Sequence, residues 1–210
     1  MKSIARRLSL AILLAMAAPA LAQGNTGGPP ELLPDEITWP PSESIPDVAG
    51  VKLGSLSVAL EETRLADVAA AVDGTVRHLG DAASSLHWIC VDTDAPPHNT
   101  RIWFVSTEIA GGAVNEIILE KHNPNGSANT LCSGIRADHL PFELPGLPFI
   151  GQQEAEARAQ LPAPGYERKG TLGFLLSRDL PEDCNLSQSL GLRIAGGRVD
   201  AISLTRITSC

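Results

Sequence analysis

Apolar and polar residues in the body of the chain follow two spacings, one typical of strands and one typical of helices. Alternation with a period of two predicts a half-buried strand, whereas apolar residues three or four positions apart predict an amphipathic helix. The helical spacing occurs in the alanine-rich segments 65–72 and 154–161, and Gly74 and Pro162 stop the two predicted helices.

Two further segments share both their pattern and their residues. Residues 109–119 read IAGGAVNEIIL and residues 194–204 read IAGGRVDAISL, at a constant offset of 85 positions. Each is a strand, a Gly-Gly turn and a strand, which predicts a β-hairpin. Another strand candidate precedes each hairpin, at 86–91 and 172–177. Each half of the body therefore has the predicted order helix, strand, strand, strand.

These elements predict an α+β fold made of two tandem repeats. Each repeat contains one helix and a three-stranded antiparallel meander. The first repeat is predicted to span residues 51–140 and the second residues 141–210, with the run PFELPGLPFIG joining them.

Strand alternation also assigns faces. In the first repeat it places Ile117 and Leu119 toward the helix, together with Trp103 and Val105. The opposite face then carries an apolar patch flanked by acids, formed by Ile102, Phe104, Glu116, Ile118 and Glu120. In the second repeat this face is small and polar, and reads as solvated: Ser187, Ser189, Ala201, Ser203 and Thr205.

An exposed apolar patch of this kind often marks a contact surface, so the first-repeat patch is the predicted binding site. The alternative is that another segment covers it. The candidates for such a cover are the other repeat, residues 122–150 and the N-terminal leader.

The N-terminus has the order of a secretory signal peptide. Lys2, Arg6 and Arg7 precede a short apolar run, and Ala20–Ala22 form an A-x-A cleavage site. Residues 1–22 are therefore a predicted signal peptide. Residues 23–50 follow as a predicted flexible, extended leader rich in proline, glycine and acids. In this leader Trp39 could anchor to another molecule, or the leader could fold back onto its own domain.

The charge balance excludes two classes of partner. The whole chain has 16 basic and 24 acidic residues, a net charge of −8, and loss of the three basic residues in the signal makes it −11. No cluster of Lys or Arg remains, so nucleic acid and anionic membrane surfaces are not expected partners. Outside the signal no apolar run approaches 18 residues, which predicts no membrane span.

The mature chain has four cysteines and no CxxC spacing. An even number in an exported chain favours two disulfides, for which three pairings are possible. In an up-down-up meander, the end of strand one, the start of strand two and the end of strand three lie at the same edge of the sheet. This geometry favours Cys90–Cys132 and Cys184–Cys210, each within its own repeat.

The tandem helix-and-meander pattern, with one disulfide per unit after a signal peptide, resembles the β-lactamase-inhibitor-protein architecture. The run GQQEAEARAQL at 151–161 is similar to the helix opening of outer-membrane assembly lipoproteins of the BamE type. The resemblance covers residues 55–121 and 147–210. It implies a binding role on a sheet face without catalysis. The lipid-accepting cysteine of those lipoproteins is absent, and no functional residue carries over.

Candidate catalytic groups are sparse. None of the five histidines lies in an HxH or HExxH frame, and Asp92-Thr-Asp94 lacks the other residues of a calcium loop, so no metal or cofactor is expected. Asp138 and His139 could form half of a catalytic triad, with His122 in the same segment.

The sequence favours an exported, non-enzymatic binding module of the periplasm or the extracellular space, which contacts a protein partner through its first sheet face. A small envelope hydrolase with a site in residues 122–150 is the second hypothesis. The third is an envelope assembly or scaffold protein that is tethered through the leader around Trp39.

Overall fold

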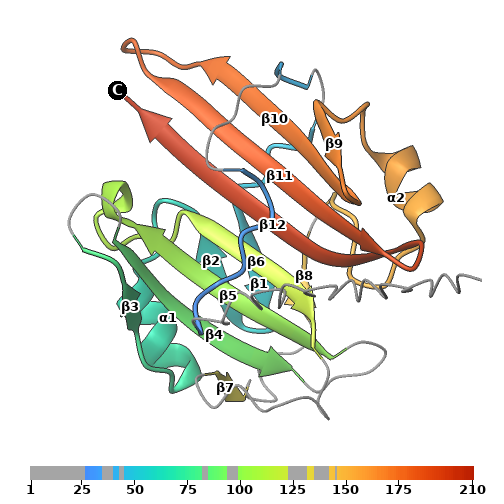
Figure 1. Cartoon of the computed structure of the whole chain (residues 1–210). Helices are drawn as coiled ribbons and strands as arrows, with labels where there is room; N and C mark the ends of the chain where they lie inside the picture. The colour runs from blue at the N-terminus through green and yellow to red at the C-terminus, as the bar shows by residue number, and fades with distance from the viewer. Residues whose placement is uncertain are drawn as a thin grey trace, which may run out of the picture.

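The computed structural model describes residues 27–34, 40–42, 45–81, 85–93, 99–122, 132–134, 142–144 and 146–210. Its elements are mostly strands, with two short α-helices, so the expected α+β class is confirmed (Figure 1).

One long sheet dominates the fold. Its order is β3-β4-β5-β6-β12-β11-β10-β9, with every neighbouring pair antiparallel, and β7 pairs in parallel with β4. The first-half strands are β3 (Arg77–Leu79), β4 (Leu86–Thr93), β5 (Thr100–Thr107), β6 (Glu116–Lys121) and β7 (Ser133–Gly134). The second-half strands are β9 (Tyr166–Arg168), β10 (Thr171–Asp179), β11 (Asn185–Ala195) and β12 (Arg198–Ser209). A small second sheet has the order β2-β1-β8 and comprises β1 (Gly50–Leu53), β2 (Leu56–Ala59) and β8 (Phe142–Glu143).

Both predicted helices form, as α1 (Leu65–Val72) and α2 (Glu154–Gln160). In α1 the buried residues Leu65, Val68 and Val72 have a helical spacing, so one face packs against the sheet. Asp73 adopts a left-handed conformation and ends the helix, and its N–H donates to the carbonyl of Ala69.

The two halves share one sheet instead of forming two separate meanders. Strands β6 and β12 pair at its centre, where Ile117 lies opposite Leu204 and Leu119 lies opposite Ile202. Pairing these two strands satisfies backbone N–H and C=O groups that each half alone would expose at an edge. Strands β3 and β9, which the alternation did not predict, extend the sheet on either side.

The two Gly-Gly corners occupy corresponding places. The first lies between β5 and β6 and the second between β11 and β12, and Gly111 and Gly196 both have φ 58°. The carbonyl of Gly112 accepts a hydrogen bond from the N–H of Leu65 at the start of α1 (2.9 Å). The carbonyl of Gly197 likewise accepts one from the N–H of Glu154 at the start of α2 (2.9 Å).

The main core lies between one face of the long sheet, here called the inner face, and a layer formed by the helices and the small sheet. Its largest fully buried members come from strands of both halves and from β1: Leu53, Ile89, Ile102, Phe104, Ile117, Leu119, Leu172, Phe174, Leu190 and Leu192. The opposite side of the long sheet is the outer face.

The described parts of the leader pack against the body. Residues 27–34, blue in Figure 1, cross the outer face of the sheet. The N–H of Ser42 donates to the carbonyl of Leu175 at the edge of β10, and Ile45 and Val48 are buried in the main core on the other side. The leader therefore wraps around the sheet edge. For these residues, the interpretation that the leader folds back onto its own domain is correct.

Both predicted disulfides are present. Cys90 in β4 bonds to Cys132, and Cys184 before β11 bonds to Cys210 after β12. Two structural disulfides indicate an oxidising compartment outside the cytoplasm. Within the described part of the chain, no helix is long and apolar enough to cross a membrane.

Candidate functional site

The register of β5 and β6 corrects the predicted binding face. Trp103 lies opposite Ile118, whereas Ile102 lies opposite Leu119 and Phe104 opposite Ile117. Directly opposed residues in an antiparallel pair share a face. Ile102 and Phe104 are therefore on the inner face, in the main core, and each is 0% exposed. The prediction that they share a face with Ile118, Glu116 and Glu120 is wrong.

The error comes from a difference between the two hairpins: the first contains a 3-10 helix, η2 (Glu108–Ala110), between β5 and β6, and the second has a register shift between Arg193 and Ile194. Glu116 and Ala201 are 85 positions apart, but their partners Val105 and Arg193 are 88 apart. The offset of the hairpin segments therefore does not extend into β5. A shift by an odd number of residues moves every side chain of a strand to the other face.

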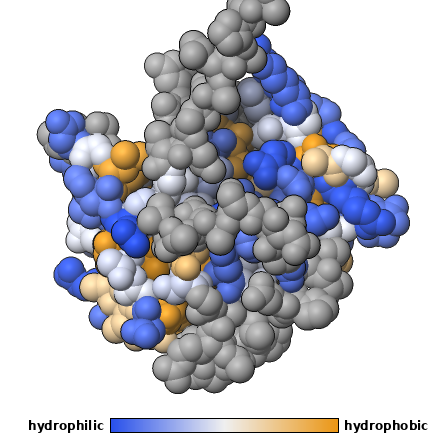
Figure 2. Space-filling view, turned by 60° about the horizontal axis from the view of Figure 1, so that its bottom comes forward, coloured by the Kyte–Doolittle hydropathy of each residue, from blue (hydrophilic) through white to orange (hydrophobic). Residues whose placement is uncertain are grey.

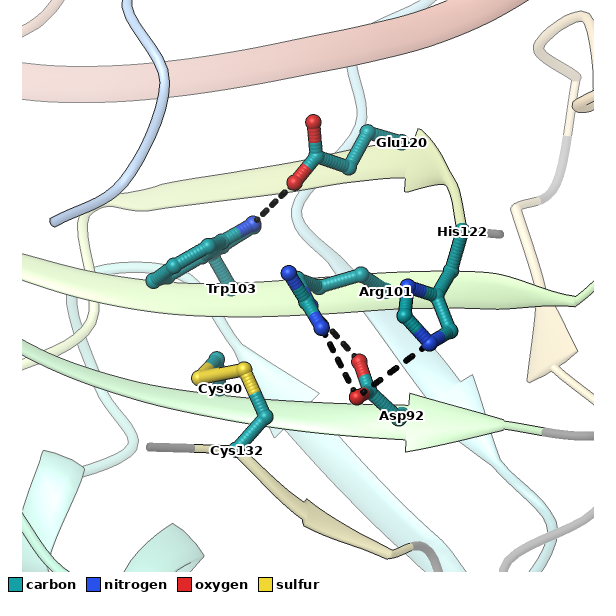
Figure 3. Close-up of a disulfide and its surroundings, with 7 residues drawn as sticks. All are labelled: Cys90, Asp92, Arg101, Trp103, Glu120, His122 and Cys132. Carbon is teal, nitrogen blue, oxygen red and sulfur yellow. Dashed lines mark hydrogen bonds and ion pairs between the residues drawn. A yellow bond between two sulfur atoms is a disulfide. The ribbon is translucent and has the colours of Figure 1, made fainter. Parts of the chain in front are cut away.

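The outer face of the first half carries a second, aromatic cluster, formed by Trp88, Cys90, Trp103, Val105 and Ile118. The rings of Trp88 and Trp103 stack with their centroids 6.5 Å apart and their planes at 24°. The Cys90–Cys132 disulfide lies beside Trp103 (Figure 3). Leu32 of the leader packs against this cluster.

Charged groups flank the aromatic cluster in Figure 3. Arg101 donates from Nε and Nη2 to the two carboxylate oxygens of Asp92, at 2.7 and 2.9 Å, and this pairing raises the pKa of the guanidinium. The indole Nε1 of Trp103 donates to Oε1 of Glu120 at 3.2 Å. Arg101 also lies over the Trp103 ring, 5.9 Å from its centroid. These contacts hold Trp103 and its charged neighbours in fixed positions.

Glu116 lies half-buried at the start of β6, on the outer face. Burial raises the pKa of its carboxyl to about 7. A hydrogen bond with Thr205 of β12 acts against this shift, and the negative charge of Glu31 in the leader adds to it. Across β5 its opposed neighbour is the apolar Val105, so no basic group of that strand pairs with it directly.

The outer face of the second half carries small side chains, and other residues cover it. Ser189, Ala201 and Ser203 are at most 6% exposed, so the expectation of a solvated face is wrong for these three residues. A Cβ atom on Gly191 would lie 2.9 Å from Cγ of Leu33. Leu33 therefore lies against the backbone of β11, where the absence of a side chain makes room for it.

Large exposed apolar side chains are few among the described residues: Val76, Leu79, Ile109 and Phe149. Figure 2 shows hydrophobic surface as small separate patches among hydrophilic residues. The aromatic cluster is not one of these patches, because Trp88 and Trp103 are only 6% and 2% exposed. In β4 and β5 the residues of the aromatic cluster alternate with residues of the main core. This alternation is the sequence signal by which the aromatic cluster could have been found.

The residues of the hydrolase hypothesis are only partly described. Asp138 and His139 lie outside the described residues, as does Trp39 of the scaffold hypothesis. Nε2 of His122 is 3.7 Å from the Asp92 carboxylate, which is longer than a hydrogen bond. Asp92 is already held by Arg101, so His122 is a second neighbour of a carboxylate that an arginine binds.

No group of three or more His, Cys, Asp or Glu is arranged to hold a metal ion in the part of the chain that the structure describes. His78 and His87 lie opposite each other on β3 and β4 with ring centroids 4.8 Å apart. The sequence spacing did not indicate this pair, because β3 was not predicted.

Comparison with protein families, with curated proteins and with solved structures finds no match for this chain. The resemblance to the inhibitor-protein and assembly-lipoprotein architectures therefore stays a prediction.

Proposed function

We propose that this protein is an exported, non-enzymatic binding protein that contacts a protein partner through the outer face of its long sheet. The observation that carries the proposal is the way the leader lies there: Leu32 packs on the aromatic cluster and Leu33 lies against Gly191. This face thus receives a chain segment through side-chain contacts, without a covering helix or sheet.

The groups on this face suit protein recognition. Stacked indoles offer a large apolar area at little cost in side-chain entropy, and aromatic residues are enriched at interface centres. Glu116 and Glu120 are the acidic residues of the face that the sequence singled out, and they favour a partner with a basic rim. In this proposal Trp88 and Trp103, together with Ile118, take the place of Ile102 and Phe104.

The proposed place of action is the periplasm or the extracellular space. The signal-peptide pattern in residues 1–22 and the two disulfides support it.

We also propose that the two halves derive from one duplicated unit. The sequence match of the hairpins supports this, as do the equivalent hydrogen bonds from Leu65 to Gly112 and from Glu154 to Gly197. In both halves a helix is followed by four strands of the long sheet, α1 by β3–β6 and α2 by β9–β12. A duplication explains why one half kept indoles on its outer face while the other has serine and glycine there.

The test uses the mature chain as bait in an extract of its native envelope, with mass identification and cross-linking of retained proteins. Glu120→Lys and Thr205→Arg alter the outer face, and Ile109→Ser is the matched control because Ile109 is exposed on η2, outside the strands of the sheet. A true partner is retained by the wild type and the control, is lost with both face variants, and forms cross-links to the outer face. Equal retention by all four baits would overturn the proposal.

A further inference from the structure

The leader segment 27–34, with the sequence GGPPELLP and here called the strap, occupies the proposed binding face. We propose that the strap is an intramolecular occupant of this face, and that the partner displaces it with an extended segment of its own. That segment carries two adjacent aliphatic side chains, preceded by a basic or neutral residue. This inference rests on the proposed function and adds the chemistry of the partner.

The two leucines of the strap define the two aliphatic positions. Leu32 contacts the aromatic cluster of the first half, and Leu33 lies against Gly191 of the second half. Leu33 lies at a bend of the strap, and the two adjacent leucines reach different parts of the face. A partner segment with the same pair of side chains would fill both places.

The strap is held by side-chain contacts alone. In the described part of the chain, no backbone hydrogen bond joins residues 27–34 to the sheet. The backbone anchors begin further along, where Ser42 donates to the carbonyl of Leu175 and the N–H of Val48 donates to Oε1 of Gln188 at 3.0 Å. The strap can therefore leave while the anchored residues stay, because no hydrogen-bonded ladder must break.

One buried donor is left unused under the strap. The indole Nε1 of Trp88 is buried and has no acceptor among the described residues, and Gly28 of the strap lies close to it. Buried polar atoms in folded proteins are nearly always hydrogen-bonded, so an unpaired one needs an explanation. A partner segment that places a carbonyl oxygen over Trp88 would satisfy this donor, which the strap does not.

The charge of the strap is also poorly matched to the face. Glu31 lies close enough to Glu116 for its negative charge to disfavour ionisation of that carboxyl. In the described part of the chain, the hydroxyl of Thr205 in β12 hydrogen-bonds with Glu116, and the apolar Val105 of β5 lies opposite it. A basic residue in the place of Glu31 would attract the Glu116 carboxylate instead of repelling it.

The experiment measures peptide binding to the mature, disulfide-bonded chain in a Trp39→Phe background. Trp88 and Trp103 are then its only tryptophans, so fluorescence reports on the face. The probe is a synthetic peptide with the sequence of residues 27–34 carrying Glu31→Lys. Its control has both leucines replaced by serine. The two chains compared are one with the native strap and one with Leu32→Ser and Leu33→Ser.

The peptide binds only those chains whose face is not covered by the strap. The apparent affinity of the native chain is therefore the intrinsic affinity multiplied by the fraction of chains with a free face. We expect the strap variant to bind the probe at least about tenfold more tightly than the native chain, and the serine control not to bind. Equal affinity of the two chains, or no binding to either, overturns the inference. If the double variant does not fold, Leu33→Ala provides the same comparison.

This outcome is independent of the bait experiment. Retention of a partner through the outer face together with equal peptide affinities would overturn the inference and leave the proposed function standing. Equal retention by all baits together with a tenfold peptide difference would overturn the proposed function, and with it the partner that we infer.

Discussion

Leu33 of the leader lies against Gly191 of β11, so that a Cβ atom on Gly191 would come within 2.9 Å of the Leu33 Cγ atom. The two residues are far apart in the sequence, and their contact seats the strap on the sheet. It also makes Gly191 sensitive to the smallest possible substitution.

Gly191→Ala is expected to lower the free energy of unfolding by about 1–3 kcal/mol, because the added methyl group crowds Leu33 and also Ser203, whose Oγ would be 2.5 Å away. Urea unfolding measures the change. Gly28→Ala is the matched control, since its Cβ atom would make ordinary contacts of 3.5 Å or more, and it should be nearly neutral. Similar values for the two variants would show that Leu33 is not seated on Gly191.

Phe104→Ala is expected to lower the free energy of unfolding by about 3–5 kcal/mol, because it opens a cavity in the main core. Phe104 is 0% exposed there, among core residues of both halves. Ile109→Ala, at a side chain that is 73% exposed, should change stability by less than about 0.5 kcal/mol. Chemical denaturation of both variants tests the register of β5, since a small effect of Phe104→Ala would place that residue outside the core.

Glu116 should make stability depend on pH. The folded state raises the pKa of its carboxyl from the ordinary value of 4.5 to about 7. Between these values the unfolded chain releases a proton that the folded chain retains, so stability falls as pH rises from about 4.5 to about 7 and is level above that. The loss is up to about 3 kcal/mol.

Glu116→Gln should flatten this part of the stability profile and make the protein more stable than the wild type at neutral pH. Urea midpoints measured from pH 4.5 to 8 give the comparison. A variant profile parallel to that of the wild type would mean that another group titrates. Glu108→Gln, at an exposed position on η2, is the control and should leave the slope unchanged.

The two disulfides should differ in what their loss does to the aromatic cluster. Replacing Cys90 and Cys132 by serine opens a loop of 42 residues, and replacing Cys184 and Cys210 opens one of 26 residues. The chain-entropy estimate is about 4 kcal/mol for the first and about 3.5 kcal/mol for the second. Because Cys90 belongs to the aromatic cluster, only the first pair should shift the tryptophan emission of the folded protein. An equal spectral change in both variants would contradict this assignment.

Local spacing was enough to predict several parts of this molecule. The helices at 65–72 and 154–161, and the strands before each hairpin, follow from side-chain periodicity within one segment. The disulfide pairing followed from the way a meander brings alternate strand ends to one edge, and both bonds are present. The alternation of side chains in β5 also put Trp103 and Val105 of the aromatic cluster on one face, although that face was predicted to point toward the helix.

The sequence by itself therefore determined the two helices, the three main strands of each half and which cysteines meet, because those properties depend on neighbouring residues and on chain direction. The tertiary structure alone decided which side of β5 faces the helices. The connection between Val105 and Glu116 is three residues longer than the one between Arg193 and Ala201, and periodicity within one strand does not reveal which residues of the neighbouring strand lie opposite it. It also decided what covers the outer face, since contacts such as that of Leu33 with Gly191 join segments whose separation in the chain carries no local signal.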